Sequence, residues 1–88
     1  MRSIKLSGRE ASVIRAIGFT EAMLGTDIQD HTRMEIDDVA DALNGLIAAG
    51  FVEPIPYSDQ VGLAEMPSTA FEINPAYVQP LRQALVRR

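Results

Sequence analysis

The sequence predicts a small α+β domain that is mostly helical, with three N-terminal helices, a two-stranded hairpin and a C-terminal helix. Apolar residues recur at helical spacing in the first half of the chain, whereas two short segments rich in strand-forming residues follow, separated by a polar loop. The chain has 88 residues, which leaves room for one hydrophobic core. We therefore expect residues 1–88 to form a single domain.

Capping-box spacing marks three helix starts in the first part of the chain. A hydroxyl residue is followed three positions later by Glu or Gln in three pairs: Ser7 with Glu10, Thr26 with Gln29, and Thr32 with Glu35. The apolar pattern then predicts a first helix over about 8–24, with Gly25 just past its end, and a short second helix over about 27–31.

The third predicted helix, over about 33–49, has the clearest pattern. One core-facing stripe recurs at helical spacing and comprises Ile36, Val39, Ala40, Leu43, Leu46 and Ile47. The Asn44-Gly45 pair could instead form a turn between two helices, but the second of these would be too short to be stable. We therefore expect one helix that ends at Gly50.

The second half of the chain predicts a hairpin and a final helix. Phe51–Ile55 and Thr69–Ile73 are expected to pair within a hairpin over 51–73, with a polar loop over about 57–68. Three aromatic residues are assigned to packing in the hairpin and core: Phe51, Tyr57 and Phe71. Asn74 is a candidate cap and Pro75 the first residue of a helix over 75–87, in which Pro80 marks either a kink or the start of the regular part.

Charge is distributed unevenly along the chain, whose net charge is −4. No Lys or Arg occurs between Met34 and Leu81. The same stretch contains eight carboxylates: Glu35, Asp37, Asp38, Asp41, Glu53, Asp59, Glu65 and Glu72. This acidic middle, with cationic residues toward both ends, argues against nucleic acid as the main partner.

Composition also bounds the location of the protein. No apolar run approaches the roughly 20 residues that cross a bilayer, and the N-terminal MRSIKLSGRE has no signal-peptide stretch. The chain contains no cysteine, so it has neither a disulfide framework nor a thiolate metal site. We expect a cytoplasmic protein without a membrane partner.

Motifs for catalysis are missing from the sequence. There is no glycine-rich phosphate loop and no nucleophile elbow, so we expect neither an enzyme nor a bound cofactor. The single histidine, His31, lies near Asp27, Asp30 and Glu35, which makes a metal site conceivable. The interpretation that we adopt is a capping or solvated His31 in a polar helix-turn segment, with no metal.

Two segments resemble the winged helix-turn-helix superfamily, as in bacterial regulators of the MarR, ArsR and PadR kinds. LNGLIAAGFVE, over 43–53, resembles the end of a recognition helix that enters the first strand of the wing, and FEINPAY, over 71–77, resembles the second wing strand passing into the final helix. The resemblance implies that the third helix enters the DNA major groove and that the loop over 57–68 is the wing.

Transferred to this sequence, the resemblance places six residues toward the groove: Met34, Asp37, Asp38, Asp41, Gly45 and Ala48. Carboxylates at these positions would repel phosphates. Acidic residues in the first turn of a helix also stabilise the helix, because they interact favourably with its dipole. Toward the C-terminal end of the helix, the exposed face carries only small residues, Ala42, Gly45, Ala48 and Ala49, and is nearly flat. We therefore expect a winged-helix protein that acts through protein contacts, as a homodimer or an adaptor.

The alternative is a dimeric DNA-binding regulator. Its candidate phosphate contacts are the basic residues Arg2, Lys5, Arg9, Arg33, Arg82, Arg87 and Arg88. Candidate dimer contacts on the final helix are Tyr77, Val78, Leu81 and Leu85, although the same residues could pack on the domain's own core. No feature supports a third class, a small-molecule sensor.

Overall fold

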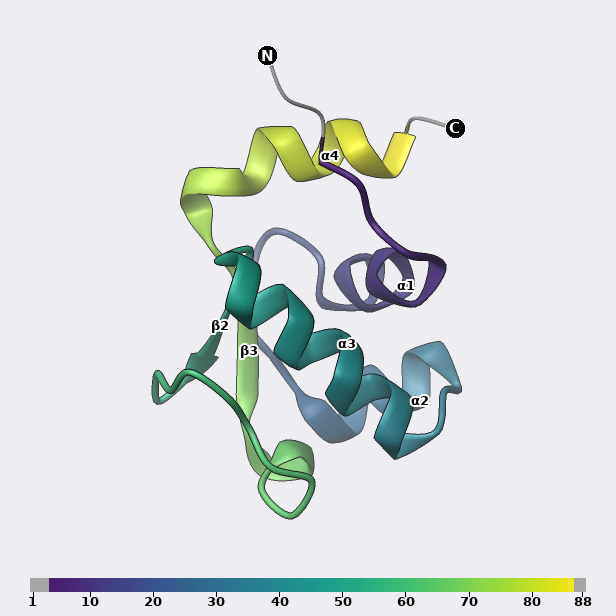
Figure 1. The fold of residues 1–88 in the computed structure, drawn as a ribbon, viewed down its shortest axis with the longest axis vertical. Helices are drawn as coiled ribbons and strands as arrows, with labels where there is room; N and C mark the ends of the chain where they lie inside the picture. The colour runs from purple at the N-terminus through teal and green to yellow at the C-terminus, as the bar shows by residue number, and fades with distance from the viewer. Residues whose placement is uncertain (1–3, 87–88) are drawn as a thin grey trace.

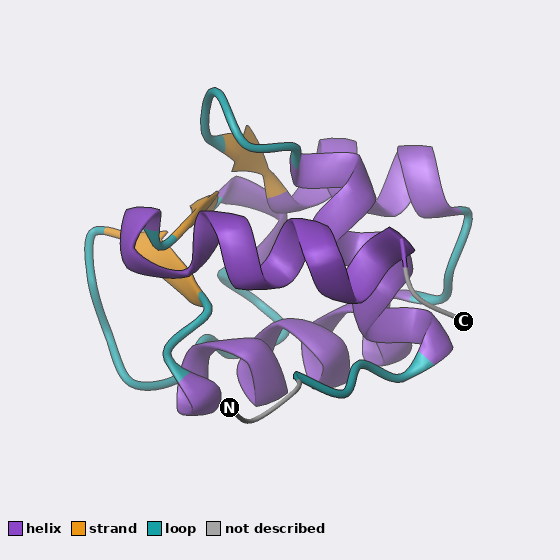
Figure 2. Ribbon diagram, turned by 90° about the horizontal axis from the view of Figure 1, so that it is seen from above, coloured by secondary structure: helices purple, strands orange, loops and turns teal. Residues whose placement is uncertain are grey.

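A computed structural model of the protein describes residues 4–86. In chain order the elements are α1 (Gly8–Ile17), β1 (Met23–Leu24), α2 (Gly25–Thr32), α3 (Ile36–Ala49), β2 (Val52–Ile55), the 3-10 turn η1 (Met66–Ser68), β3 (Ala70–Ile73), the 3-10 turn η2 (Pro75–Tyr77) and α4 (Val78–Val86) (Figure 1). The predicted α+β class with mostly helical structure is confirmed. The strands gather at one side of the helices (Figure 2).

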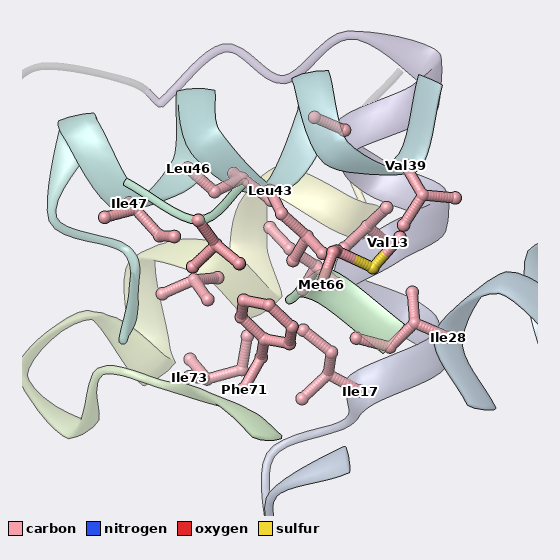
Figure 3. Packing of buried hydrophobic residues seen from close by; sticks show 14 of the residues in the cluster. Val13, Ile17, Ile28, Val39, Leu43, Leu46, Ile47, Met66, Phe71 and Ile73 are labelled. Atoms are coloured by element: carbon pink, nitrogen blue, oxygen red, sulfur yellow. The ribbon is translucent and has the colours of Figure 1, made fainter. Parts of the chain in front are cut away.

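The sheet is antiparallel with strand order β1-β3-β2, so β3 is its central strand. Phe71 on β3 is fully buried and points toward α3, together with Ile73 (Figure 3). Around it, α1 contributes Val13 and Ile14 and α3 contributes a row of aliphatic side chains. One apolar core between the sheet and the helices thus holds the elements together.

The first helix is shorter than predicted. It ends at Ile17 because Gly18 takes a positive φ of 75° and its N–H donates to the carbonyl of Ile14. Residues 23–24 do not continue the helix but form β1, in which Met23 pairs with Phe71. The sheet therefore has three strands, where the sequence predicts two.

Of the three predicted capping boxes, only the first is confirmed. The Ser7 hydroxyl accepts from the Glu10 N–H and the Glu10 carboxylate accepts from the Ser7 N–H. The second box is wrong, because α2 begins at Gly25 and so does not follow Thr26. Gly25 is accordingly the first residue of a helix and not the residue after one.

The third box is also wrong. The hydroxyl of Thr32 donates back to the carbonyl of Ile28 at 2.9 Å, and Arg33 ends α2 in the left-handed conformation with φ 59°. The chain needs further residues to turn, so α3 begins at Ile36 with Glu35 as its N-cap. Arg33 and Met34 lie in the turn and outside the helix that the sequence predicts over 33–49.

From Ile36 onward α3 follows the prediction. It runs unbroken through Asn44-Gly45 and ends at Gly50, which has a left-handed φ of 86°. The predicted stripe faces the core, with Ile36 half-buried and the other members buried. Ala42, which the sequence places on the exposed face, is buried beside them.

The predicted hairpin is confirmed, with Val52 opposite Ile73 and Pro54 opposite Phe71. Asn74 caps the following turn by accepting from the Ala76 N–H, as predicted. The helix predicted over 75–87 begins as η2 and continues as α4, with Pro80 in the first turn of α4, where a missing N–H costs little. Arg87 lies outside the described residues.

Among residues 4–86, no helix has the length and apolar character needed to span a membrane.

Gly25 supports a test of the packing between α2 and η1. A Cβ added at Gly25 would overlap the carbonyl oxygen of Met66, whose side chain is also in contact. We expect Gly25→Ala to lower the free energy of unfolding by about 2 kcal/mol, the usual cost of overpacking a core, as measured by urea denaturation. Gly8→Ala is the control, because an added Cβ there meets nothing within 4 Å. Equal stability of the two variants would contradict the close contact.

Candidate interaction surfaces

Four of the six predicted recognition residues form an exposed ridge along α3. Asp37, Asp41, Gly45 and Ala48 are exposed and share one side of the helix at 100° per residue. We call these four residues the α3 ridge. The ridge bears two carboxylates and no cation, which is unfavourable for contact with a phosphate backbone.

The other two predicted residues do not belong to the ridge. Met34 precedes α3 and packs, partly buried, against the core. Asp38 is half-buried and its carboxylate lies 3.4 Å from the guanidinium of Arg9. The resemblance to a recognition helix placed both residues on the exposed face, which fails for Met34 because α3 starts at Ile36.

Gly45 has a neighbour within the domain. A Cβ at this position would lie 3.3 Å from Oε2 of Glu10, the residue whose other carboxylate oxygen caps α1. The glycine thus leaves room for the start of α1 beside α3. This contact accounts for a small residue at position 45 without a partner molecule.

On its other side, α3 holds the loop between β2 and β3. The Asn44 side chain donates to the carbonyl of Val61 at 3.0 Å and accepts from its N–H at 2.8 Å. Val61 and Met66 are buried in the core, so the expected wing over 57–68 is tied back to α3 and α2 at these two residues. The sequence prediction of a polar loop missed both anchors.

The exposed part of this loop contains Tyr57, which is 66% exposed. Its hydroxyl donates to the carboxylate of Asp59 at 3.3 Å, and this hydrogen bond raises the pKa of Tyr57 above its ordinary value. Tyr57 was predicted to pack in the hairpin or the core, and its exposed side chain lies outside the core. Phe71 is buried as predicted, and Phe51 packs edge-on against Tyr77 with ring centroids 5.0 Å apart.

The basic residues predicted to contact phosphate do not share one environment. Lys5 and Arg33 are exposed, Arg9 is paired with Asp38, and the guanidinium of Arg82 lies 5.1 Å from the ring centroid of Phe19. Arg15, which was not among the predicted contacts, donates to the carbonyl of Leu85 near the end of α4. Arg2, Arg87 and Arg88 lie outside the described residues.

The predicted dimer residues pack on their own domain. Leu81 is fully buried in the core, while Tyr77, Val78 and Leu85 are partly buried against it. Val86, at the end of α4, is 79% exposed. The arrangement favours the alternative that these four residues hold α4 to the core, and Leu81 has no surface to offer a second subunit.

The outer face of the sheet, pointing away from the core, was not predicted as a surface. Register aligns Leu24, Ala70 and Ile55 in one row across the three strands, and Leu24 and Ile55 are 41% and 45% exposed. In the next row Glu53 stands directly opposite Glu72, and both are half-buried. The alternation of residue types along β2 and β3 in the sequence could have indicated this face. Its third strand, which contributes Leu24, was predicted to be helical.

His31 contacts the backbone of its own helix. Its Nδ1 lies 3.1 Å from the carbonyl oxygen of Asp27, one helical turn earlier. In the part of the chain that the structure describes, no group of three His, Asp or Glu side chains is placed to hold a metal ion. Comparisons with protein-family models, with curated proteins and with solved structures find no significant match for this chain.

The link between α3 and the loop predicts the effect of Asn44→Ala. Both hydrogen bonds to Val61 would be lost, so we expect the free energy of unfolding to fall by about 1–2 kcal/mol and hydrogen exchange of the Val61 amide to accelerate. Ser58→Ala is the control, since the Ser58 hydroxyl donates only to Gln60 within the exposed part of the loop. Unchanged protection of Val61 in Asn44→Ala would show that the loop is held by other contacts.

The opposed carboxylates predict a gain in stability when one is neutralised. Like charges directly opposite on neighbouring strands are destabilising, so Glu72→Gln should raise the free energy of unfolding by about 0.5 kcal/mol at neutral pH. Glu65→Gln removes the same charge from an exposed loop position and should have a smaller effect. Urea denaturation measures the free energy of unfolding of both variants. A lower value for Glu72→Gln than for the unmodified protein would contradict repulsion between Glu53 and Glu72.

Proposed function

We propose that the chain is a winged-helix-type domain that acts by protein–protein contact through the α3 ridge. The proposal is supported by the order of the elements: three helices, with a short strand between the first two, then a hairpin and a final helix. This order agrees with the resemblance found in the sequence. Fold resemblance alone does not fix a function, so the ridge itself must support the choice.

The observation that carries the proposal is the chemistry of the α3 ridge. Its exposed side chains are Asp37 and Asp41, followed by Gly45 and Ala48, and α3 contains neither Lys nor Arg. Phosphate contacts from cations supply much of the affinity of DNA-binding proteins and hold the reading helix in register. Arg9, whose guanidinium reaches this helix from α1, is already paired with Asp38.

The flat end of the ridge suits a protein surface. Gly45 and Ala48 present little side chain, so a partner can approach the helix backbone closely, while Asp37 and Asp41 can pair with cations at the rim. The partner is a second copy of the chain or a different protein. Charge complementarity of this kind steers association and selects partners more than it adds affinity.

DNA binding is the second candidate. It is favoured by the exposed Arg33, which lies in the turn directly before α3, and by the element order itself. In this alternative the protein would hold DNA through Arg33 and the cations near the chain ends, with α3 lying in the groove despite its carboxylates.

Site-specific photocrosslinking tests the proposed function. A photoreactive residue in place of Ala48 should yield a discrete adduct, either with a second copy of the purified protein or with another protein in cells that naturally make it. Combining it with Asp37→Lys and Asp41→Lys should abolish the adduct, because the ridge charge is reversed. The same residue in place of the exposed Ala76 should give none.

The matched control reverses two exposed carboxylates elsewhere, Asp27→Lys with Asp30→Lys on α2. This variant has the same change in net charge and should keep the adduct. No protein adduct at position 48, or an adduct that survives reversal of the ridge, would overturn the proposed function.

A further inference from the structure

The outer face of the sheet is a second surface, separate from the α3 ridge. The inner residues of β2 and β3, such as Val52 and Phe71, are buried beneath α3, so the alternate residues point away from that helix. Helix α3 and the strand β3 behind it can be followed in Figure 1. A molecule bound to this outer face would not touch the α3 ridge.

The apolar part of this face is the row Leu24–Ala70–Ile55. The two larger side chains are more than two-fifths exposed and stand on either side of the small Ala70. Exposed leucine and isoleucine side chains in one row leave apolar area in contact with water, which favours cover by a partner.

The charged part lies beside this row. Glu72 faces Glu53 across the strands and also lines, with Glu21, a hollow of about 170 Å³ next to the β3 end. Phe19, Pro75 and Val78 form apolar walls of the same hollow. Within residues 4–86, no ion pair joins Glu21, Glu53 or Glu72 to a cation, and the nearby Arg82 stacks on Phe19 instead.

We propose that the outer sheet face binds a protein segment that combines apolar side chains with a lysine or arginine. The apolar side chains would cover the Leu24–Ala70–Ile55 row. The cation would enter the hollow between Glu21 and Glu72, where its aliphatic stem meets the apolar walls and its charge relieves the repulsion between Glu72 and Glu53.

Charge complementarity selects this occupant over others. A second copy docked through the same face would bring the same carboxylates against each other, and a nucleic acid would bring phosphates. A bare metal ion is not supported, since no three-carboxylate group is placed to hold one in the described part of the chain. The proposal does not depend on the function of the α3 ridge.

The probe for this proposal is a short synthetic peptide that alternates leucine and lysine, titrated into isotope-labelled protein and followed by NMR. Amide shifts should concentrate at Leu24, Ile55 and Glu72. Glu72→Gln should weaken binding about two- to fivefold, the effect of losing one partly exposed ion pair. Ile55→Ser should weaken it as well, because the apolar row is interrupted.

Matched controls separate this site from general attraction to an acidic protein. Asp30→Asn on α2 removes one exposed charge outside both proposed surfaces and should leave the affinity unchanged. Peptides with glutamate for lysine, or serine for leucine, should bind much more weakly. The proposal is overturned by absence of shifts at millimolar peptide, by shifts centred on α3, by equal weakening in Asp30→Asn, or by equal binding of the serine peptide. Shifts centred on α3 would overturn this proposal and leave the α3 ridge as the binding surface, whereas loss of the crosslink at Ala48 would leave binding at the outer sheet face intact, so the two failures are distinguishable.

Discussion

The close contact between Gly25 and Met66 is the constraint on which the arrangement of this domain depends. The Gly25 N–H donates to the carbonyl of Thr69 at 2.9 Å, and the missing side chain allows the Met66 backbone and sulfur to lie against the start of α2. This contact joins the loop before β3 to the junction between β1 and α2. It thereby holds β1 against the central strand and lets Met66 fill the core beneath α2 and α3 (Figure 3).

Two surfaces result from this packing, and both are acidic. With the loop tied to Asn44 and Met66 in the core, α3 is bordered by α1 on one side and by the loop on the other, which leaves only the narrow α3 ridge exposed. Behind the core, strand β1 widens the sheet, so that Leu24 lies in one row with Ala70 and Ile55. The absence of cations from the middle of the sequence therefore has a spatial counterpart on two faces of the domain.

The parts of the fold that the sequence predicts well are those set by local pattern. The stripe on α3, the left-handed glycine at its end and the Asn74-Pro75 cap need only neighbouring residues, and all three are found. Predictions fail where a distant contact decides. Met23 and Leu24 continue a helical apolar pattern, yet they form a strand because β3 offers them an edge and Gly18 has already ended the helix. Gly25 fits the position after a helix equally well, and only its contact with Met66 makes it the start of one. The site follows the same division: the exposed α3 residues come from periodicity, whereas the opposition of Glu53 and Glu72 depends on strand register, which the sequence left open.

We propose that the α3 ridge faces a protein and not a base pair. Fluorescence anisotropy of the wild-type protein with a labelled mixed-sequence duplex, at about 50 mM and then about 200 mM salt, tests it most directly. We expect no binding at micromolar protein even at the lower salt concentration, because the ridge presents carboxylates to the phosphates. Micromolar or tighter binding that weakens steeply as the salt concentration rises would contradict it and would favour the DNA-binding alternative.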